Sequence, residues 1–176
     1  MHLHENRRLG VMAQLGMISL CLKVFLGSMA SAISAEPHLK RDSIEGIWIN
    51  DTGQGAIQIR PCSSAADIAG MCGYIVWIHP DTRQNKPLLL DSLNPDPEKR
   101  QRLICGLQVI GRLQRQENGT WDKGWIYDPK KGKSFDVTVS RVSENNIQVT
   151  GYMGIKLFSQ SFVWERAQPN IELCAQ

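Results

Sequence analysis

The sequence lacks the short motifs by which the common enzyme classes are recognised. It contains no G-x-S-x-G nucleophile elbow, no glycine-rich phosphate loop after a strand, and no readable cysteine–histidine pairing. It also lacks any C-x-x-C, and only His38 and His79 follow residue 35, which disfavours a zinc site. We therefore expect a non-enzymatic protein with no metal and no cofactor.

The sequence also has little net charge and few long apolar runs. The whole chain carries +3, and without its first 35 residues about +1. Nucleic-acid binding needs a concentrated basic face, so no nucleic-acid partner is expected, and Lys130, Lys131 and Lys133 are interpreted as a solvated hairpin tip. No stretch after residue 35 approaches the roughly eighteen continuous apolar residues of a membrane span.

Residues 1–35 have the pattern of a secretory signal peptide. Arg7 and Arg8 precede a mostly apolar run, and small residues follow it in an A-x-A pattern that ends at Ala32. We expect cleavage after Ala32 or Ala35, which leaves one domain over residues 36–176 in the periplasm or outside the cell. An uncleaved signal anchor is the alternative.

Four cysteines follow this leader, and an even number in an exported chain favours disulfides. Cys62 and Cys72 flank a short polar connection between two strand-like runs, so we prefer a bridge between them. Cys105 would then pair with Cys174 and tie the tail to the domain.

The rest of the chain repeats short apolar runs with a period of two, separated by turn residues. Strands are expected over Ile44–Asn50, Ala56–Pro61, Gly73–His79, Leu103–Gln114, both arms of the hairpin Trp121–Val142, Ile147–Tyr152 and Gln160–Arg166, with Met153–Ser159 as an apolar link. The pattern predicts an all-β protein, an antiparallel meander of about eight strands. Such a meander can close into a barrel whose interior is filled by side chains or holds one small ligand.

One long connection, residues 80–102, interrupts the meander. It is rich in proline, asparagine and charge, and a helical turn is expected after Pro97. Long connections in small domains often carry function. The alternative is a plain solvent loop capped by Asp96.

The two ends of the meander carry a matching pair of residues. Closure would make the first and last strands neighbours, so Arg166 is expected to lie over the indole of Trp48 in a cation–π contact. Gly46 and Trp164 belong to the same barrel-closing set. A first-strand G-x-W with a late arginine resembles the calycin superfamily, which includes the lipocalins and avidin-like proteins.

A broader set of residues resembles one bacterial family, the secreted domain of unknown function 2147 family. The matching residues are Gly46, Trp48, Ile59–Cys62, Cys72–Trp77, Asn94–Asp96, Arg100, Cys105–Leu107, Trp121, Asp122, Gly124, Ile126–Pro129, Gly132, Lys133, Gly151, Tyr152, Gly154, Trp164 and Arg166. The resemblance implies a lipocalin-like barrel exported by Gram-negative bacteria, with no established activity. Phe135 stands where the family pattern suggests tyrosine, and the connection from Cys62 to Cys72 is longer than usual.

The leading hypothesis is a carrier of a small apolar or amphipathic molecule. Trp77, Trp125 and Tyr127 are candidate pocket walls, although alternation does not decide which of Trp125 and Ile126 faces inward. The further candidates for ligand binding are Asn94, Asp96 and Arg100, on a loop expected to act as a partial lid, and Asp128.

Two other functions stay open at this point. The first is an interaction module without a cavity that recognises a cell-envelope partner. The second is a hydrolase that uses Asp96 and Asp128, although aspartates beside glycine or proline are usually turn formers. The sequence leaves the oligomeric state undecided.

Overall fold

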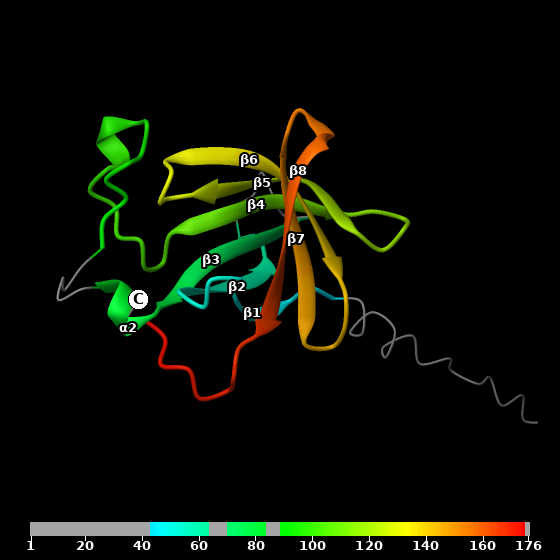
Figure 1. Ribbon diagram of the computed structural model, residues 1–176, viewed down its shortest axis with the longest axis horizontal. Coiled ribbons are helices and arrows are strands. Elements are labelled where there is room, and N and C mark those ends of the chain that lie inside the picture. Colours follow the sequence, from blue (N-terminus) through cyan, green and yellow to red (C-terminus); the bar gives the residue numbers. More distant parts are fainter. Residues whose placement is uncertain (1–42, 64–69, 84–88, 175–176) are drawn as a thin grey trace, which may run out of the picture. The chain divides into compact units, whose positions relative to one another are not determined.

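Eight antiparallel strands follow one another along the chain (Figure 1). The computed structural model describes residues 43–63, 70–83 and 89–174. The elements are β1 (Gly46–Ile49), β2 (Gly55–Pro61), β3 (Met71–Ile78), α2 (Pro80–Arg83), η1 (Pro97–Lys99), β4 (Gln108–Arg115), β5 (Trp121–Asp128), β6 (Lys133–Arg141), β7 (Asn146–Met153) and β8 (Ile155–Arg166). The expected signal peptide lies outside the described residues.

Each strand pairs with the next, and β8 returns to pair with β1, so the sheet is a closed barrel. The predicted eight-stranded meander is confirmed. Closure pairs the outer edges of the first and last strands, which removes most of the unpaired backbone that invites aggregation. Neither described helix is long and apolar enough to cross a membrane.

The structure corrects two predicted boundaries. The strand expected from Leu103 begins only at Gln108, because the chain first turns through Gly106, which has a φ of +85°. The segment Met153–Ser159, expected to be a link, instead belongs mostly to β8. Its ladder with β7 continues to the tip, where Met153 pairs with Ile155. The helical turn expected after Pro97 is present as η1, with the Asp96 side chain as its N-cap.

The closing contact between β1 and β8 is the one expected from the sequence. The guanidinium of Arg166 lies 4.2 Å from the centroid of the Trp48 ring, and the two residues are paired across the strands. Trp48 is fully buried, and its indole N–H donates to the carbonyl of Ile44 over 2.8 Å. Gly46 has a φ of +143°, and the Arg166 guanidinium occupies the space that a Cβ would need there. A side chain at position 46 would displace the arginine.

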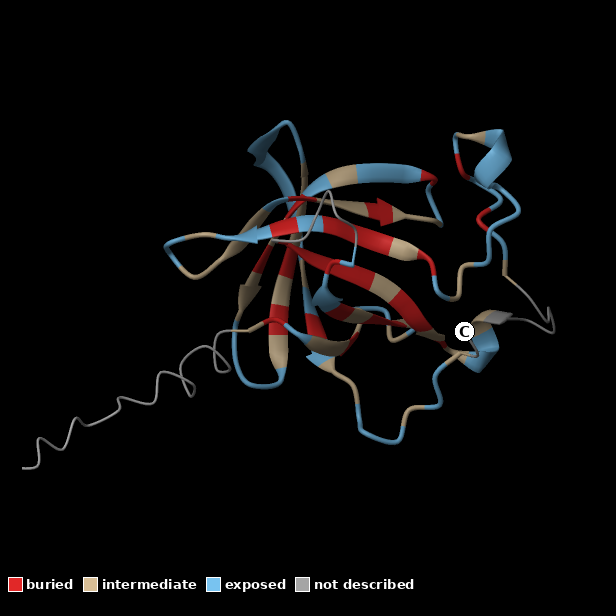
Figure 2. Ribbon diagram, turned by 180° about the vertical axis from the view of Figure 1, so that it is seen from behind, coloured by how far each residue is buried: buried red, intermediate tan, exposed pale blue. Residues whose placement is uncertain are grey.

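Side chains pack the half of the barrel that surrounds this contact. Burial alternates along much of β6 and β7, because successive side chains point to opposite faces of a sheet, whereas nearly all of β3 is buried and the first part of β8 is exposed (Figure 2). The packed half contains Trp48, Ile59, Leu113, Val137, Val139 and Ile147, all of them almost fully buried. This packing closes one end of the barrel and leaves the other end to the turns between β1 and β2, β5 and β6, and β7 and β8.

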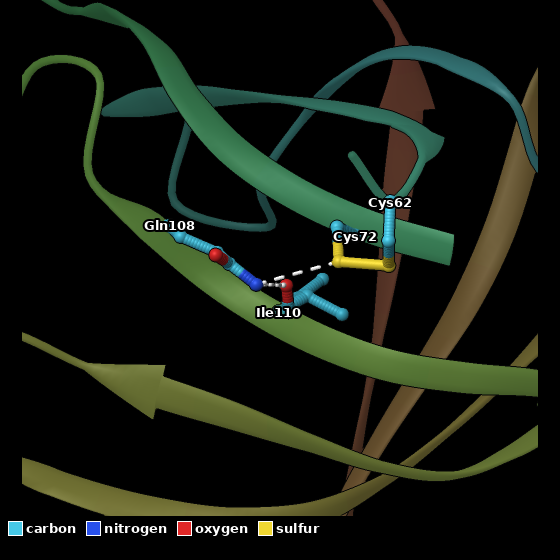
Figure 3. The surroundings of a disulfide bond; sticks show 4 residues. All are labelled: Cys62, Cys72, Gln108 and Ile110. Atoms are coloured by element: carbon cyan, nitrogen blue, oxygen red, sulfur yellow. Dashed lines mark hydrogen bonds between the residues drawn. A yellow bond between two sulfur atoms is a disulfide. The ribbon is translucent and has the colours of Figure 1, made fainter. Parts of the chain in front are cut away.

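Both expected disulfides are present. Cys62 and Cys72 join the ends of β2 and β3 with their Cα atoms 5.0 Å apart, and Gln108 donates to the sulfur of Cys72 over 3.3 Å (Figure 3). Cys105 and Cys174 are bonded with their Cα atoms 6.2 Å apart. The tail after β8 thus ends beside β3, where the backbone N–H of Cys174 donates to the carbonyl of Val76 (Figure 1).

We expect Arg166→Met to lower the free energy of unfolding by about 1–2 kcal/mol, because the contact with Trp48 is desolvated on the indole side. Urea unfolding followed by tryptophan fluorescence measures this loss. Arg60→Met is the matched control, since Arg60 lies 4.4 Å from the Tyr74 ring centroid on an exposed part of β2, and it should cost about 0.5 kcal/mol. Equal losses in the two variants would contradict a special role for the closing contact.

The two disulfides should differ in their contribution to stability. The Cys105–Cys174 bridge spans 69 residues and the Cys62–Cys72 bridge spans 10, and a longer loop loses more entropy when it is closed in the unfolded chain. Replacing both cysteines of a pair by serine should cost about 4 kcal/mol for the long loop and about 3 kcal/mol for the short one. Urea titrations of the two double variants test this order, and the reverse order would contradict it.

Candidate ligand-binding cavity

The half of the barrel away from Trp48 contains a cavity of about 1250 Å³ that is open at the surrounding turns. This volume exceeds the roughly 300–1,000 Å³ of typical small-molecule pockets. Trp164 lies at the boundary between the two halves, because it is buried and also lines the cavity. The side chains of the barrel therefore do not fill its interior.

The wall of the cavity is mostly apolar. It is built from residues of seven strands, β2 to β8, among them Ile57, Ile75, Val109, Ile126, Phe135, Val149, Phe162 and Trp164. The backbone alternation of each strand sends these side chains to the interior. Phe135, where the family pattern suggests tyrosine, is one of them, so the wall carries an apolar ring at that place.

The structure decides which of Trp125 and Ile126 faces inward. Ile126 lines the cavity. Trp125 is paired with Gly111 of β4, and its ring lies directly over the space that a Cβ of Gly111 would occupy. Trp125 therefore covers the outside of the barrel.

The rim of the cavity is polar and carries both signs of charge. Asp51, Thr52 and Gln54 come from the β1–β2 turn, and Asp128, Lys130 and Lys131 come from the β5–β6 turn. Lys131 and Asp128 form an ion pair of 3.2 Å, while the Lys130 ammonium donates to the neutral side chain of Gln54. An apolar interior thus ends in groups that can bind a polar or charged headgroup.

The long loop supplies one wall of the mouth. Its residues Leu89, Leu90, Ser92, Leu93 and Ile104 line the cavity. The part of the loop expected to act as a lid, residues 94–100, does not. Among the described residues of this connection, those that line the cavity lie on either side of η1, and η1 itself does not line it.

A buried polar cluster fixes this loop to the barrel. Asp91 is fully buried and accepts hydrogen bonds from Tyr127 over 2.6 Å, from Asn94 over 2.7 Å and from Arg102 over 2.7 Å. The Asn94 amide also donates to the Tyr127 hydroxyl over 3.1 Å. The Asp91 carboxylate thereby connects the loop residues Asn94 and Arg102, which lie on either side of η1, to Tyr127 of β5.

The titration of this cluster follows from its contacts. Burial alone would raise the pKa of Asp91, but the hydrogen bonds from Tyr127, Arg102 and Asn94 outweigh it, and the pKa lies below its ordinary value. Burial and the neighbouring Asp91 carboxylate raise the pKa of Tyr127 to about 12. At neutral pH the carboxylate is therefore charged and the phenol neutral, so the pair acts as a fixed structural anchor rather than a proton-transfer site.

A second contact joins the loop to the barrel at Gly132. This residue of the β5–β6 turn has a φ of +62°, and a Cβ there would collide with the backbone carbonyl of Leu93. The absence of a side chain lets the turn lie directly against the loop. The cavity wall at Leu93 is thus supported from two sides.

The structure places the residues predicted for ligand binding in three groups. Tyr127 and Asp128 line the cavity. Asn94, Asp96 and Arg100 shape the loop: the guanidinium of Arg100 donates to the Asn94 carbonyl over 2.8 Å, and Asp96 pairs with Lys99. Trp77 and Trp125 contribute nothing to the wall, because Trp77 packs edge-on against His79 and Trp125 covers Gly111. The ligand-binding role of these residues stays a prediction.

The sequence analysis missed Asp91 and Arg102 as site residues. Asp91 directly follows an apolar run of three leucines, which is the one sign in the sequence that its carboxylate is buried. A buried charge needs a partner, but the spacing of eleven residues to Arg102 lies in an irregular loop and indicates no contact. Among the described residues, no cluster of three histidines, cysteines or carboxylates has the arrangement of a metal site.

Comparison with known proteins supports this description of the fold. The structure is similar to that of protein HP1028 from the human pathogen Helicobacter pylori, which belongs to the lipocalin family. The match has a TM-score of 0.60 and 18% sequence identity, and it covers 72% of this chain and 84% of that chain. At this identity the similarity shows a lipocalin-like fold alone. No curated protein matches the chain.

The family comparison covers most of the described domain. The family described as "Uncharacterized protein conserved in bacteria (DUF2147)" matches residues 46–166. These residues run from Gly46 on β1 to Arg166 on β8, so the match includes both closing strands, the long loop and all of the strands between them. The chain therefore belongs to the DUF2147 family of uncharacterised bacterial proteins.

Proposed function

We propose that this protein binds a small amphipathic molecule in the open half of its barrel. The observation that carries the proposal is the cavity of about 1250 Å³ lined by the strands and the long loop. A molecule with an apolar body would remove its own surface and that of the wall from water, at a gain of about 25 cal/mol per Å² of apolar area. The apolar wall favours such a ligand over a sugar or a nucleotide.

The polar side chains of the rim support a ligand with a polar end. Lys130 and Gln54 are bonded to each other at the mouth, and Ser159 and Gln160 line the same opening. These groups offer donors and acceptors to a headgroup while the apolar part lies among Ile126, Phe135 and Phe162. This arrangement supports an amphipathic ligand over a wholly apolar one.

The proposed place of action is outside the cytoplasm, in the periplasm or the medium. Two disulfides support it, because such bonds persist in oxidising compartments and are rare in the cytosol. The signal-peptide pattern of residues 1–35 also favours this location. Export and binding would be consistent with carriage of a poorly soluble molecule across the cell envelope.

The two other functions receive less support. An interaction module without a cavity does not account for the open half of the barrel. A hydrolase based on Asp96 and Asp128 needs both carboxylates at one substrate, but only Asp128 lines the cavity. Each of the two aspartates forms an ion pair with the lysine three residues later, as expected for turn residues.

Filling the cavity should abolish binding. Gly151 lines it, and a Cβ added there would meet only the Cβ of Phe135, at 4.0 Å, so a large side chain can enter without a backbone clash. We expect Gly151→Phe to weaken binding of the fluorophore N-phenyl-1-naphthylamine at least tenfold, about 1.4 kcal/mol. A fluorescence titration measures the affinity, and circular dichroism verifies that the variant is folded.

Gln148→Phe is the matched control, because Gln148 lies on the same strand between the buried residues Ile147 and Val149 and faces outward. It should bind the fluorophore as the unmodified protein does. No binding by the unmodified protein, in a sample stripped of bound molecules by organic solvent and refolded, would contradict the proposal. So would equal affinities of the two phenylalanine variants.

The anchor of the loop wall should fail at high pH. The folded state raises the pKa of Tyr127 from 10.0 to about 12, so its stabilising effect is complete below pH 10 and is lost as the pH rises through 12. Burial and Asp122 raise the pKa of Tyr152 in the same direction. The free energy of unfolding of the unmodified protein should therefore fall as the pH rises from 8 to 12. In Tyr127→Phe we expect this fall to be smaller by about 2 kcal/mol.

Urea midpoints between pH 8 and 12 measure this difference. Tyr152→Phe is the control, and it should remove a separate part of the alkaline loss, so that the double variant shows the sum. If Tyr127→Phe lost as much unfolding free energy between pH 8 and 12 as the unmodified protein, the raised pKa of Tyr127 would not contribute to stability, and the prediction would be wrong.

A further inference from the structure

The tip of the β7–β8 hairpin exposes a cluster of large apolar side chains. Met153 is 66% exposed, Ile155 58%, Leu157 81% and Phe158 74%. These four residues lie within six positions of the chain, and the tip extends from the sheet at the top of Figure 1. We call them the hairpin tip patch. Singly exposed apolar residues need no explanation, but a contiguous patch on a surface marks a binding site.

The backbone beside this patch also lacks a partner on one side. Strand β8 has twelve residues, but β1 has only four and pairs with β8 at Glu165 and Arg166 alone. Among the described strands, only β7 therefore pairs with the rest of β8. The hairpin extends beyond the part of β8 that is paired with β1. Its tip can therefore contact another surface without disturbing the packed half of the barrel.

The patch is continuous with the wall of the cavity. Met153 and Phe158 belong to both, and Ser159 and Gln160 of the same strand line the mouth. A surface that contacted the patch would therefore also lie against the opening of the cavity. Met153 and Phe158 therefore belong to the surface patch and to the cavity lining at once.

Lysines surround the same opening. The turns over residues 50–55, 128–133 and 153–158 carry four lysines and two aspartates. Lys131 pairs with Asp128 and Lys156 with Asp122, but the Lys130 ammonium donates to the neutral Gln54, and neither it nor Lys133 forms an ion pair within the described part of the chain. The ammonium groups of Lys130, which lines the mouth, and of Lys133 at the start of β6 are thus not held in ion pairs.

We propose that the hairpin tip patch and the lysines of the β5–β6 turn dock the protein on an anionic lipid bilayer, with the mouth of the cavity against the membrane. Exposed Leu157 and Phe158 enter the interfacial region, and the lysines contact anionic headgroups. Exposed apolar side chains that insert and lysines that bind anionic headgroups are the two features that hold a protein on an anionic bilayer surface. The docking itself needs no bound ligand. It extends the proposed function, on which it rests, because the membrane would supply or receive the amphipathic molecule.

Flotation with vesicles tests the docking. The disulfide-bonded protein is mixed with vesicles of phosphatidylcholine alone or with about one quarter phosphatidylglycerol, and the bound fraction is measured after density-gradient centrifugation. We expect binding to the anionic vesicles to be at least tenfold tighter than to the neutral ones, and to weaken with added salt. The variant Ile155→Asp/Leu157→Asp, whose two positions do not line the cavity, should lose this binding at least tenfold.

Val142→Asp is the matched control, because Val142 is 58% exposed in the β6–β7 turn at the packed end of the barrel. It should float with the vesicles as the unmodified protein does. Failure of the unmodified protein to bind, equal binding by the tip variant, or loss in Val142→Asp would each overturn the proposal. A dimer in solution that the tip variant converts to a monomer without vesicle binding would overturn it in favour of self-association.

Fluorophore binding separates this proposal from the proposed function. The tip variant should keep its affinity for N-phenyl-1-naphthylamine, because the cavity wall is unchanged. Fluorophore binding without vesicle binding would remove the docking and leave the carrier function. Vesicle binding without fluorophore uptake would remove the carrier function and leave the docking.

Discussion

The contact between Arg166 and Trp48 is the constraint on which the rest of the structure depends. It joins the last strand to the first, and β1 is so short that only two residue pairs connect it with β8. Without that junction the meander would be an open sheet with two unpaired edges. A planar guanidinium lies over a buried indole and beside a glycine with no side chain, so this contact supports the pairing of β8 with β1 that closes the barrel.

Closure at one end explains why the other end can be hollow. The packed half around Trp48, Val137 and Val139 buries enough apolar surface to hold the barrel without filling its whole length. The hollow half is supported instead by the loop, which Asp91 attaches to Tyr127 and Arg102. The packed core and the cavity thus lie in different halves of the barrel.

Much of the fold could be predicted from the sequence. The period-two pattern fixed the number and order of the strands, since strand alternation is local and the turns at Asn118-Gly119 and Asp128-Pro129 interrupt it clearly. The match of Trp48 with Arg166 followed from topology, because a closed meander makes its ends neighbours. The Cys62–Cys72 bridge followed from the position of the two cysteines on either side of a short connection between strands, and Cys105 and Cys174 were the pair that remained.

The site was less predictable, for physical reasons. Trp125 and Ile126 are both apolar, so alternation alone left their faces undecided until the contact with Gly111 placed Trp125 outside. The buried Asp91 finds Tyr127 across 36 positions of sequence, and no periodic pattern links a loop to a strand. The tip of β8 was misread as a link because its side chains are apolar on both faces, a pattern that usually indicates burial and here accompanies exposure.

The central claim is that a closed barrel keeps half of its interior open for a ligand. A crystal structure of the protein purified from its native compartment without organic extraction tests it most directly. The account predicts a ring of eight strands with electron density for a bound molecule among Ile126, Phe135 and Phe162, and its polar end near Lys130. An open sheet, or an interior filled by the protein's own side chains, would contradict it.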